Sequence, residues 1–506
     1  MSTKEEMVLI YKYKIEKQHS KNKYHAIERI QMLVDQGTFR EISRAMSDYS
    51  HCSCGNGQAV PYDGVITGRG KIRGKTVYIY SQDFTVKGGT IGRRHGEKIA
   101  RIIKIAIETK CPVIGIYDSG GARIDEGINA LAGCGDMMHQ NTLASGLIPQ
   151  FSVTVGPCAG AAAYSPAITD FAFMVQHISY MFITGAEVVK NATGEICTNQ
   201  ELGGATIHNE TSGCVHRVFH NEKDLFKALR NLVEMLPANC FDENITKNKF
   251  VQKSYVSDDC MPNDPQKPYD LKSVIDIIAD DNSFFEIWDA FAASIVVGFA
   301  KVSGITVGIV ANQPLELGGA ITIDSSDKAA RFIRFCDCFN IPIVTLVDTP
   351  GYLPGIGQEH SGIIRHGAKL LFAYSESTVP KITAVLRKAY GGAYIAMGSK
   401  HLGADYVYAL PTAQIAVMGA QGAVPIYYKE ELSKVSDTEE KQALLKEKLE
   451  EYKKNFMNAD VALKEGFVDE LIELCDLRQR IFEDIIALKS KTINTSGKKK
   501  HGNIPL

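Results

Sequence analysis

An internal repeat constrains this chain of 506 residues more than any other feature of its sequence. Residues of the first half recur in the second half after a fixed interval of 230 positions, without a gap. Because chance does not keep one register over about fifty residues, the repeat predicts two copies of one fold. The matched pairs are Lys71 and Lys301, Gly74 and Gly304, Thr76 and Thr306, Val77 and Val307, Gly88 and Gly318, Gly89 and Gly319, Lys98 and Lys328, Ala100 and Ala330, Arg101 and Arg331, Pro112 and Pro342, and Asp118 and Asp348.

Each copy alternates extended and helical patterns in the same order. A segment rich in β-branched residues leads through a Gly-Gly loop into a helix with apolar spacing, and two further buried strands follow. This alternation predicts an α/β fold with right-handed crossovers. The segments are 77–86, 95–110, 112–121 and 148–156 in the first copy, and 307–317, 325–340, 342–351 and 379–386 in the second.

The domain boundaries follow from the repeat and from one polar segment. We expect amphipathic helices over residues 1–35, a first domain over 36–242 and a second over 274–506. Residues 243–273 are polar and contain prolines, and this composition predicts a linker. The last eleven residues, SGKKKHGNIPL, are locally basic and predict a solvated tail.

Composition excludes several classes of function. A formal net charge of −2 argues against a dedicated nucleic-acid binder. The charged N-terminal segment resembles neither a signal peptide nor a membrane span, and twelve scattered cysteines suit a reducing compartment, so we expect a cytoplasmic protein without direct membrane insertion. The close cysteine pairs, Cys52 with Cys54 and Cys336 with Cys338, have one intervening residue where zinc sites usually have two to four, so we expect no metal.

Two stretches of small residues are the candidate functional elements. GPCAGAAAYSP (156–166) and RKAYGGAYIAMGS (387–399) both follow a predicted strand and precede a predicted helix. The first backbone amides of a helix lack intrahelical partners, and small residues let a ligand oxygen approach them. The stretches therefore predict two oxyanion holes, unless they only allow close packing of helix on sheet. The Gly88–Gly89 and Gly318–Gly319 loops offer a second source of inward-facing amides.

Motifs that would indicate other functions are incomplete or missing. GRGKIRGKT (68–76) lacks the spacing of a phosphate-binding loop, and no G-x-S-x-G motif is present, which disfavours a serine hydrolase.

The motifs DSGGARIDEG, GPCAGAAAYSPA, SYMFITG, CDCFNIPIVTLVDTPGYLPG and VPKITAVLRKAYGGAY resemble the carboxyltransferase (beta) subunits of biotin-dependent acyl-CoA carboxylases. The similarity is greatest to propionyl-CoA carboxylase and methylmalonyl-CoA carboxyltransferase, and it covers residues 25–490. It implies two tandem crotonase-like domains, in agreement with the repeat. It also implies transfer of a carboxyl group between carboxybiotin and the α-carbon of a short-chain acyl-CoA, either propionyl-CoA or acetyl-CoA.

The resemblance assigns roles to individual residues. It implies that the amides of Gly160 and Ala161 hold the thioester oxygen, and that those of Gly392 and Ala393 hold the ureido oxygen of biotin, beside Gly391. Many relatives have glycine where this chain has Ala161. Propionyl-selective members often have aspartate at the position of Ile395, so acyl-chain preference stays open, as does the alternative that Ile395 is a core residue.

Partners are also implied by the resemblance. The chain contains no Met-Lys dipeptide, the usual biotinylation site, and no Gly-rich ATP-binding module. Biotin is then carried on a partner protein, and biotin carboxylase and biotin carboxyl carrier subunits are expected. The family precedent is a homo-hexamer of two stacked trimers in which the N-terminal copy of one subunit faces the C-terminal copy of another. Two alternatives stay open: the carboxyltransferase subunit of a sodium-pumping decarboxylase, and a non-catalytic scaffold paralogue.

Overall fold

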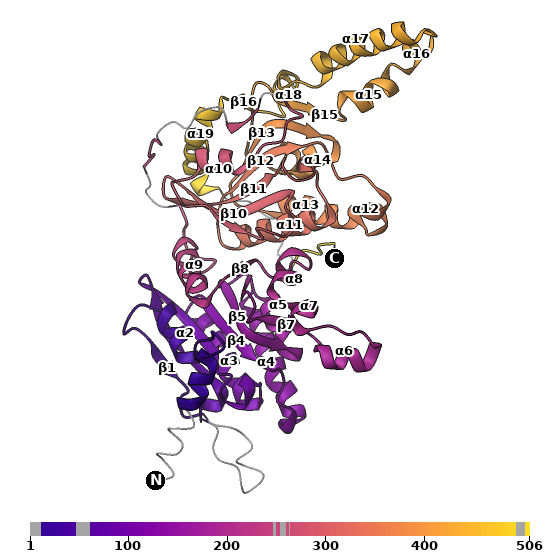
Figure 1. Ribbon diagram of the computed structural model, residues 1–506. Coiled ribbons are helices and arrows are strands. Elements are labelled where there is room, and N and C mark those ends of the chain that lie inside the picture. The colour runs from indigo at the N-terminus through magenta and orange to yellow at the C-terminus, as the bar shows by residue number, and fades with distance from the viewer. Residues whose placement is uncertain are drawn as a thin grey trace, which may run out of the picture. The chain divides into compact units, whose positions relative to one another are not determined.

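Each half of the chain folds around a mixed sheet, and the two sheets have the same plan (Figure 1). The computed structural model describes residues 12–46, 61–245, 249–253, 260–262, 264–491 and 501–505. The chain divides into two units, Met1–Asp242 and Glu243–Leu506. Cys52, Cys54 and most of the basic tail lie outside the described residues.

The first unit contains the strands β1 (Arg40–Ile42), β2 (Val65–Ile72), β3 (Lys75–Gln82), β4 (Val113–Ser119), β5 (Gln150–Ala159), β6 (Phe171–Val175), β7 (Tyr180–Phe182) and β8 (Arg217–Phe219). Its helices are α2 (Ala26–Leu33), α3 (Arg93–Glu108), α4 (Ile128–Ala144), α5 (Tyr164–Ile168), α6 (Ala186–Thr193), α7 (Asn199–Gly203), α8 (Ala205–Glu210) and α9 (Glu222–Met235), with 3-10 turns η2 (Pro61–Gly64), η3 (Lys87–Gly89), η4 (Ile124–Glu126) and η5 (Gly160–Ala163). The strand order is β1-β2-β3-β4-β5-β6-β8, and β7 pairs with the end of β5.

The second unit contains the strands β9 (Phe285–Ile287), β10 (Ile295–Val302), β11 (Ile305–Asn312), β12 (Ile343–Thr349), β13 (Lys381–Tyr390), β14 (Tyr406–Ala409), β15 (Gln414–Ala416) and β16 (Glu470–Leu471). Its helices are α10 (Lys272–Ile278), α11 (Ile323–Cys338), α12 (Ile356–His360), α13 (Ile363–Glu376), α14 (Gly391–Ala396), α15 (Ala420–Tyr427), α16 (Lys429–Ser433), α17 (Thr438–Phe456), α18 (Ala459–Lys464) and α19 (Leu474–Ala487), with 3-10 turns η7 (Leu317–Gly319), η8 (Lys400–Leu402) and η9 (Leu488–Ser490). The strand order is β16-β14-β13-β12-β11-β10-β9, and β15 pairs with the end of β13.

The strand registers define which residues of the two copies correspond. Val113 pairs with Gln150 between β4 and β5, and Ile343 pairs with Lys381 between β12 and β13. Corresponding residues therefore differ by 230 positions up to β4 and β12, and by 231 along β5 and β13 and in the turns that follow them. The predicted α/β duplication is confirmed, with one additional residue in the second copy before its longest strand.

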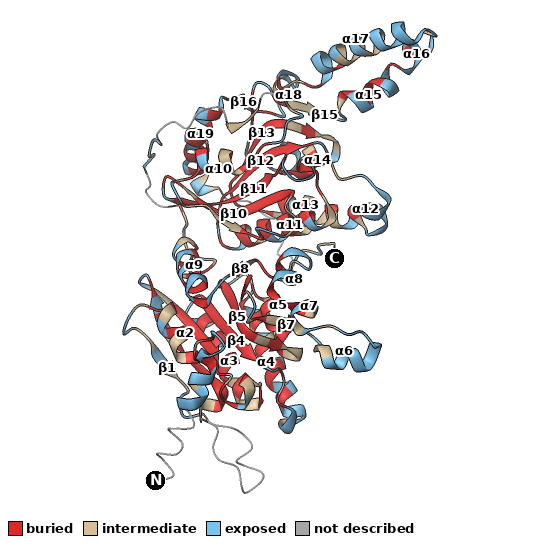
Figure 2. Cartoon of the chain, viewed as in Figure 1, coloured by how far each residue is buried: buried red, intermediate tan, exposed pale blue. Residues whose placement is uncertain are grey.

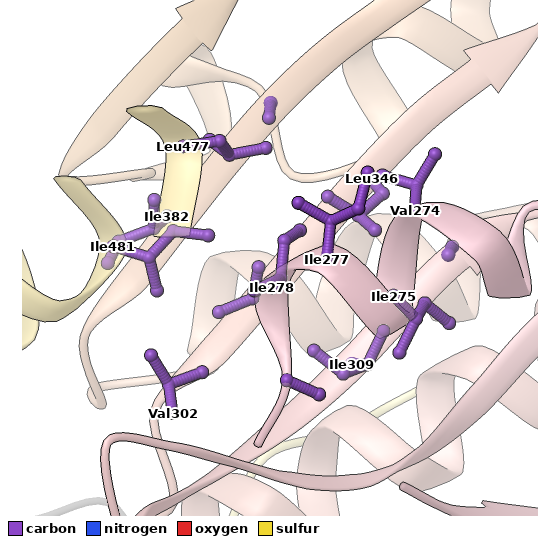
Figure 3. Close-up of a cluster of buried hydrophobic side chains, with 14 of the residues drawn as sticks. Val274, Ile275, Ile277, Ile278, Val302, Ile309, Leu346, Ile382, Leu477 and Ile481 are labelled. Atoms are coloured by element: carbon purple, nitrogen blue, oxygen red, sulfur yellow. The ribbon is translucent and has the colours of Figure 1, made fainter. Parts of the chain in front are cut away.

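Burial explains why these segments form strands and helices. Every residue of β4 and of β12 is buried, as expected for parallel strands covered on both faces (Figure 2). In the second unit a core of isoleucine, leucine and valine side chains from α10, α19 and the strands fills the space beside the sheet (Figure 3). Each such side chain contributes about 1.5–3 kcal/mol when it is fully buried.

Two predicted boundary segments are parts of the domains. Residues 243–273 were expected to form a linker, yet Tyr269 and Leu271 are buried in the second unit. Arg387 Nη1 donates hydrogen bonds to the carbonyls of Asp264 and Lys267, each at 2.9 Å. The described part of this segment therefore packs on the second unit, because its few apolar residues and its carbonyls find partners there. Likewise, α2 carries the fully buried Arg29 into the first unit.

A helical arm distinguishes the second copy. After β15, the helices α15, α16 and α17 pack on one another around Val424, Tyr428 and Tyr452 (Figure 1). In the first copy, β7, the strand beside the end of β5, leads into the short helices α6, α7 and α8. Pro425 is the sixth residue of α15 and cannot donate to a preceding carbonyl, and the helix ends two residues later. Within the part of the chain that the structure describes, α17 included, no helix is long and apolar enough to cross a bilayer.

Candidate active sites

Both small-residue stretches lie where the longest strand of a copy turns into a helix. β5 ends at Ala159 and β13 ends at Tyr390. The next residue is Gly160 in the first copy, with φ of 59°, and Gly391 in the second, with φ of 58°. This left-handed backbone strongly favours glycine, so the same turn requires the same residue twice. The position predicted for the stretches from the sequence is confirmed.

The turns present backbone amides that have no partner within the following helix. Gly391, Gly392 and Ala393 are the first three residues of α14, and such amides attract negative charge. By strand register, Ala161 corresponds to Gly392. The predicted pairs Gly160–Ala161 and Gly392–Ala393 are therefore displaced from each other by one position. Gly392 is exposed, whereas Ala393 is buried.

In both Gly-Gly loops, the second glycine donates its amide to a backbone carbonyl. The Gly89 amide donates to the Val86 carbonyl at 2.9 Å, and the Gly319 amide donates to the Glu316 carbonyl at 2.9 Å. These two amides close their own turns, and the role of the four glycines in substrate binding stays a prediction. A Cβ at Gly89 would lie 2.0 Å from the Asp118 carbonyl oxygen. The loops approach the strand ends closely, and Gly88 and Gly318 share a φ of 64° in the turns.

In the first copy, an apolar pocket of about 320 Å³ lies beside the turn. Pro157 and Ala159 of β5 line it, and Tyr180 and Phe182 of β7 form another wall. The lining also includes Phe84, Gly120, Gly185, Ala186, Glu187, Val188 and Asn199. An apolar wall next to free amides suits a thioester with a short hydrocarbon chain.

In the second copy, the corresponding wall is polar. Pro157 pairs with Tyr180, and Lys388 pairs with Gln414 at the corresponding place on β13 and β15. The hydroxyl of Tyr390, the counterpart of Ala159, donates to Gln414 Oε1 at 2.5 Å. Burial and the nearby Asp348 carboxylate raise the pKa of Tyr390 to about 12, so this hydroxyl keeps its proton at neutral pH. The second turn therefore borders groups that can form hydrogen bonds.

A buried carboxylate lies at the end of the central strand in both copies. Asp118 accepts hydrogen bonds from Lys23 Nζ at 2.7 Å and from Arg29 Nη1 at 2.9 Å. Arg29 Nε also donates to Glu222 at 2.8 Å, and the carboxylates of Glu222 and Asp118 raise the pKa of Arg29 against its burial. In the second copy, Arg387 Nε donates to Asp348 at 2.7 Å.

These charged groups were missed by the reasoning from sequence. Asp118 and Asp348 served there only as markers of the repeat, and Lys23 and Arg29 were assigned to a separate helical segment. One signal was available, because an aspartate recurred at the end of a strand that otherwise contained no charge. A buried charge at such a position requires a partner, which the sequence did not identify.

Ile395 lies on α14, and 41% of its surface is exposed. Its counterpart by register is Tyr164, which is 49% exposed. The alternative that Ile395 is a core residue is therefore wrong. Both copies present a large side chain four residues after the glycine of the turn.

Comparisons with known proteins agree with this architecture. A family model described as the carboxyl transferase domain matches residues 17–504. The chain is 49% identical to the propionyl-CoA carboxylase carboxyltransferase subunit of Haloferax mediterranei, covering 97% of this chain and 95% of that one. It is 46% identical to the methylmalonyl-CoA decarboxylase subunit alpha of Propionigenium modestum, covering 97% and 95%.

A solved structure extends the comparison to the fold. The hexameric transcarboxylase 12S, with methylmalonyl-CoA and methylmalonic acid bound, matches with a TM-score of 0.92 and 44% identity, covering 99% of this chain and 97% of that one. The expected pair of crotonase-like domains is confirmed by this match. With the family model matching nearly the whole length, the chain belongs to the carboxyl transferase domain family.

Proposed function

We propose that this chain is the carboxyltransferase subunit of a biotin-dependent enzyme that acts on a short-chain acyl-CoA, propionyl-CoA or acetyl-CoA. The observation that carries the proposal is the pair of unlike walls on two like turns. An apolar pocket borders the turn at Gly160, and polar groups border the turn at Gly391. Such a division suits two different reactants, each with an oxygen that gains negative charge during transfer.

The amides of Gly160 and Ala161 hold the thioester oxygen in this proposal, and the apolar pocket receives the acyl chain. The amides of Gly392 and Ala393, beside Gly391, hold the ureido oxygen of biotin. The short side chains of these turns fit this role, since a Cβ at Gly392 would meet no atom closer than 3.8 Å. Biotin supplies the carboxyl group when its carrier presents it, and this chain supplies donors at fixed positions.

The proposed assembly is a homo-hexamer, supported by the hexameric transcarboxylase 12S. The partners are biotin carboxylase and biotin carboxyl carrier subunits, supported by the propionyl-CoA carboxylase relatives. Ile395 is proposed as a specificity residue near the acyl group that another subunit of the hexamer presents to the second turn, supported by its exposure beside that turn. The similarity to a decarboxylase subunit supports a second candidate, in which transfer runs from methylmalonyl-CoA to biotin.

A carboxyl-transfer assay tests the proposal. Purified chain is incubated with methylmalonyl-CoA or malonyl-CoA and with biotin, either free or attached to a carrier protein, while the loss of the malonyl-type thioester is followed. We expect loss that depends on biotin. Thioester loss that is independent of biotin, or no loss with either form of biotin, would contradict the proposal.

A further inference from the structure

Lys388 lies near the end of β13, three residues before Gly391. It pairs with Gln414 at the place where the first copy has Pro157 paired with Tyr180. Because Pro157 lines the pocket beside the first turn, the register places Lys388 on the corresponding wall of the second turn. The side chain is 15% exposed, so it is neither sealed in the core nor free in solvent.

The charges around Lys388 are not balanced as they are in the first copy. Its Nζ is 3.9 Å from Oδ1 of Asp348, while Arg387 Nε occupies Oδ2 at 2.7 Å. One carboxylate thus faces two cations. In the first copy, by contrast, the carboxylates of Asp118 and Glu222 face two cations, those of Lys23 and Arg29.

The side chains of Arg387 and Lys388 differ in the contacts that fix their positions. Arg387 is 3% exposed, and three backbone carbonyls accept hydrogen bonds from its Nη1. Its guanidinium stacks over the Tyr269 ring at 4.5 Å, which fixes it in the packing of the second unit. The contact of Lys388 with Asp348 is longer than a hydrogen bond. Arg387 therefore accounts for the neutralisation of Asp348, and the charge of Lys388 is in excess.

We propose that the Lys388 ammonium binds the anionic, carboxylated ureido group of biotin at the second turn. This inference rests on the proposed function and adds to it a residue that distinguishes the biotin side from the thioester side. An ammonium beside the turn acts together with the backbone amides, because both stabilise negative charge on the same group. Proline at the corresponding position of the first copy offers no such charge to the thioester.

The charge of Lys388 gives biotin-dependent turnover a pH dependence that a purely structural role of this residue would not produce. Burial lowers the pKa of Lys388, the Asp348 carboxylate opposes this effect, and the Arg387 guanidinium adds to it. The protonated form is therefore lost at a lower pH than for an ordinary lysine. Biotin-dependent turnover should decline at alkaline pH as this proton leaves. Arginine at the same position keeps its charge throughout that range.

The test compares Lys388→Met and Lys388→Arg in the full-length protein, with free biotin and methylmalonyl-CoA. We expect Lys388→Met to lower kcat/KM for biotin at least about tenfold, with KM for methylmalonyl-CoA within about twofold of wild type. Lys388→Arg should retain activity within about threefold and should shift the alkaline decline to higher pH. Lys446→Met, on the exposed face of α17, removes one charge elsewhere and serves as the matched control.

The outcomes separate the two proposals. Absence of biotin-dependent turnover in the wild-type chain, with free biotin and with carrier-bound biotin alike, contradicts the proposed function itself. Normal wild-type turnover with unchanged kcat/KM for biotin in Lys388→Met overturns the role of Lys388 alone. So does a rise in KM for methylmalonyl-CoA as large as the loss in kcat/KM for biotin, or an alkaline decline in Lys388→Arg that is the same as in wild type. Circular dichroism and the assembly state of each variant show that it is folded.

Discussion

The first copy of the fold surrounds its strand-to-helix turn with Pro157, Ala159 and Tyr180, whereas the second has Lys388, Tyr390 and Gln414 at the same positions. The backbone is the same in both, including a glycine with nearly equal φ. The two copies therefore share the backbone amides of the turn but differ in the side chains that line it. Side chains on one short pair of strands decide which reactant each turn can accept.

The buried carboxylates show a second difference between the copies. Arg387, the partner of Asp348, comes from the strand β13 itself. Its counterpart on β5 is Gly156, where a Cβ would lie 2.1 Å from Oδ1 of Asp118. The first copy therefore leaves out this side chain and receives Lys23 and Arg29 from the N-terminal segment. One electrostatic requirement is met by local sequence in one copy and by a distant segment in the other.

Blocking either turn should have the largest effect. Gly392→Val places a branched side chain where the ligand oxygen must enter, and its Cβ meets only the Tyr352 ring, at 3.8 Å. We expect transfer to fall about 10²–10³-fold or more, as when an oxyanion donor is lost. Ala161→Val is the matched variant of the first copy. Steady-state rates with biotin and methylmalonyl-CoA measure both.

The Val variants also separate the two turns. Ala161→Val should affect the acyl-CoA side and Gly392→Val the biotin side, and unaltered activity in either would remove that turn from the site. Gly160→Val is a poor test, because φ of 59° at this position strains any branched residue.

Substituting the buried arginine of each copy tests how differently the two copies neutralise their buried carboxylates. Arg29→Met leaves the Asp118 and Glu222 carboxylates without their shared partner, and we expect a loss of about 3–5 kcal/mol in the free energy of unfolding. Arg387→Met should cost less, because Arg387 pairs with one carboxylate, Asp348, whereas loss of Arg29 also removes the ion pair of Glu222 while Lys23 stays on Asp118. Hydrogen-exchange mass spectrometry reports protection in each unit separately. Equal losses in both units would show that the charges are not distributed as described.

Lys98 and Lys328, which correspond in the repeat, should make the free energy of unfolding depend on pH. Lys328 Nζ donates to the carbonyls of Trp288 and Phe291, and burial lowers its pKa to about 7; Lys98 is held similarly, and burial lowers its pKa to about 8. Above these values the folded state binds fewer protons than the unfolded state, so the contribution to stability rises with pH until about 10.4. The slope is at most about 1.4 kcal/mol per pH unit.

Lysine-to-methionine variants of both residues measure this effect. The stability advantage of wild type over Lys328→Met should grow from about pH 7, and that over Lys98→Met from about pH 8. Denaturant midpoints between pH 6 and pH 10 provide the comparison, and subtraction of the variant cancels the other titrating groups. A difference that stays constant with pH would refute the lowered pKa values.

The smallest expected effect concerns acyl-chain preference. Ile395→Asp should shift the ratio of kcat/KM values toward propionyl-CoA over acetyl-CoA by about threefold to tenfold, or about 0.7–1.4 kcal/mol, at the lower end of what one methylene is worth in a pocket. The same change at Ile486, an exposed isoleucine of α19, is the control and should leave the ratio unaltered. An unchanged ratio in Ile395→Asp would end its role in specificity.

Sequence alone determined the duplication, the α/β fold and the two small-residue turns. These features are local or periodic. The repeat is recognised from a constant interval between matching residues, and the left-handed turns are marked by Gly160 and Gly391. Only the tertiary structure decided that the Gly89 and Gly319 amides close their own turns, that Arg29 neutralises Asp118, and that Lys388 stands where Pro157 does. Such partners are brought together by strand register and by packing of distant segments, and a register change of one residue between the copies is invisible until the strands are paired.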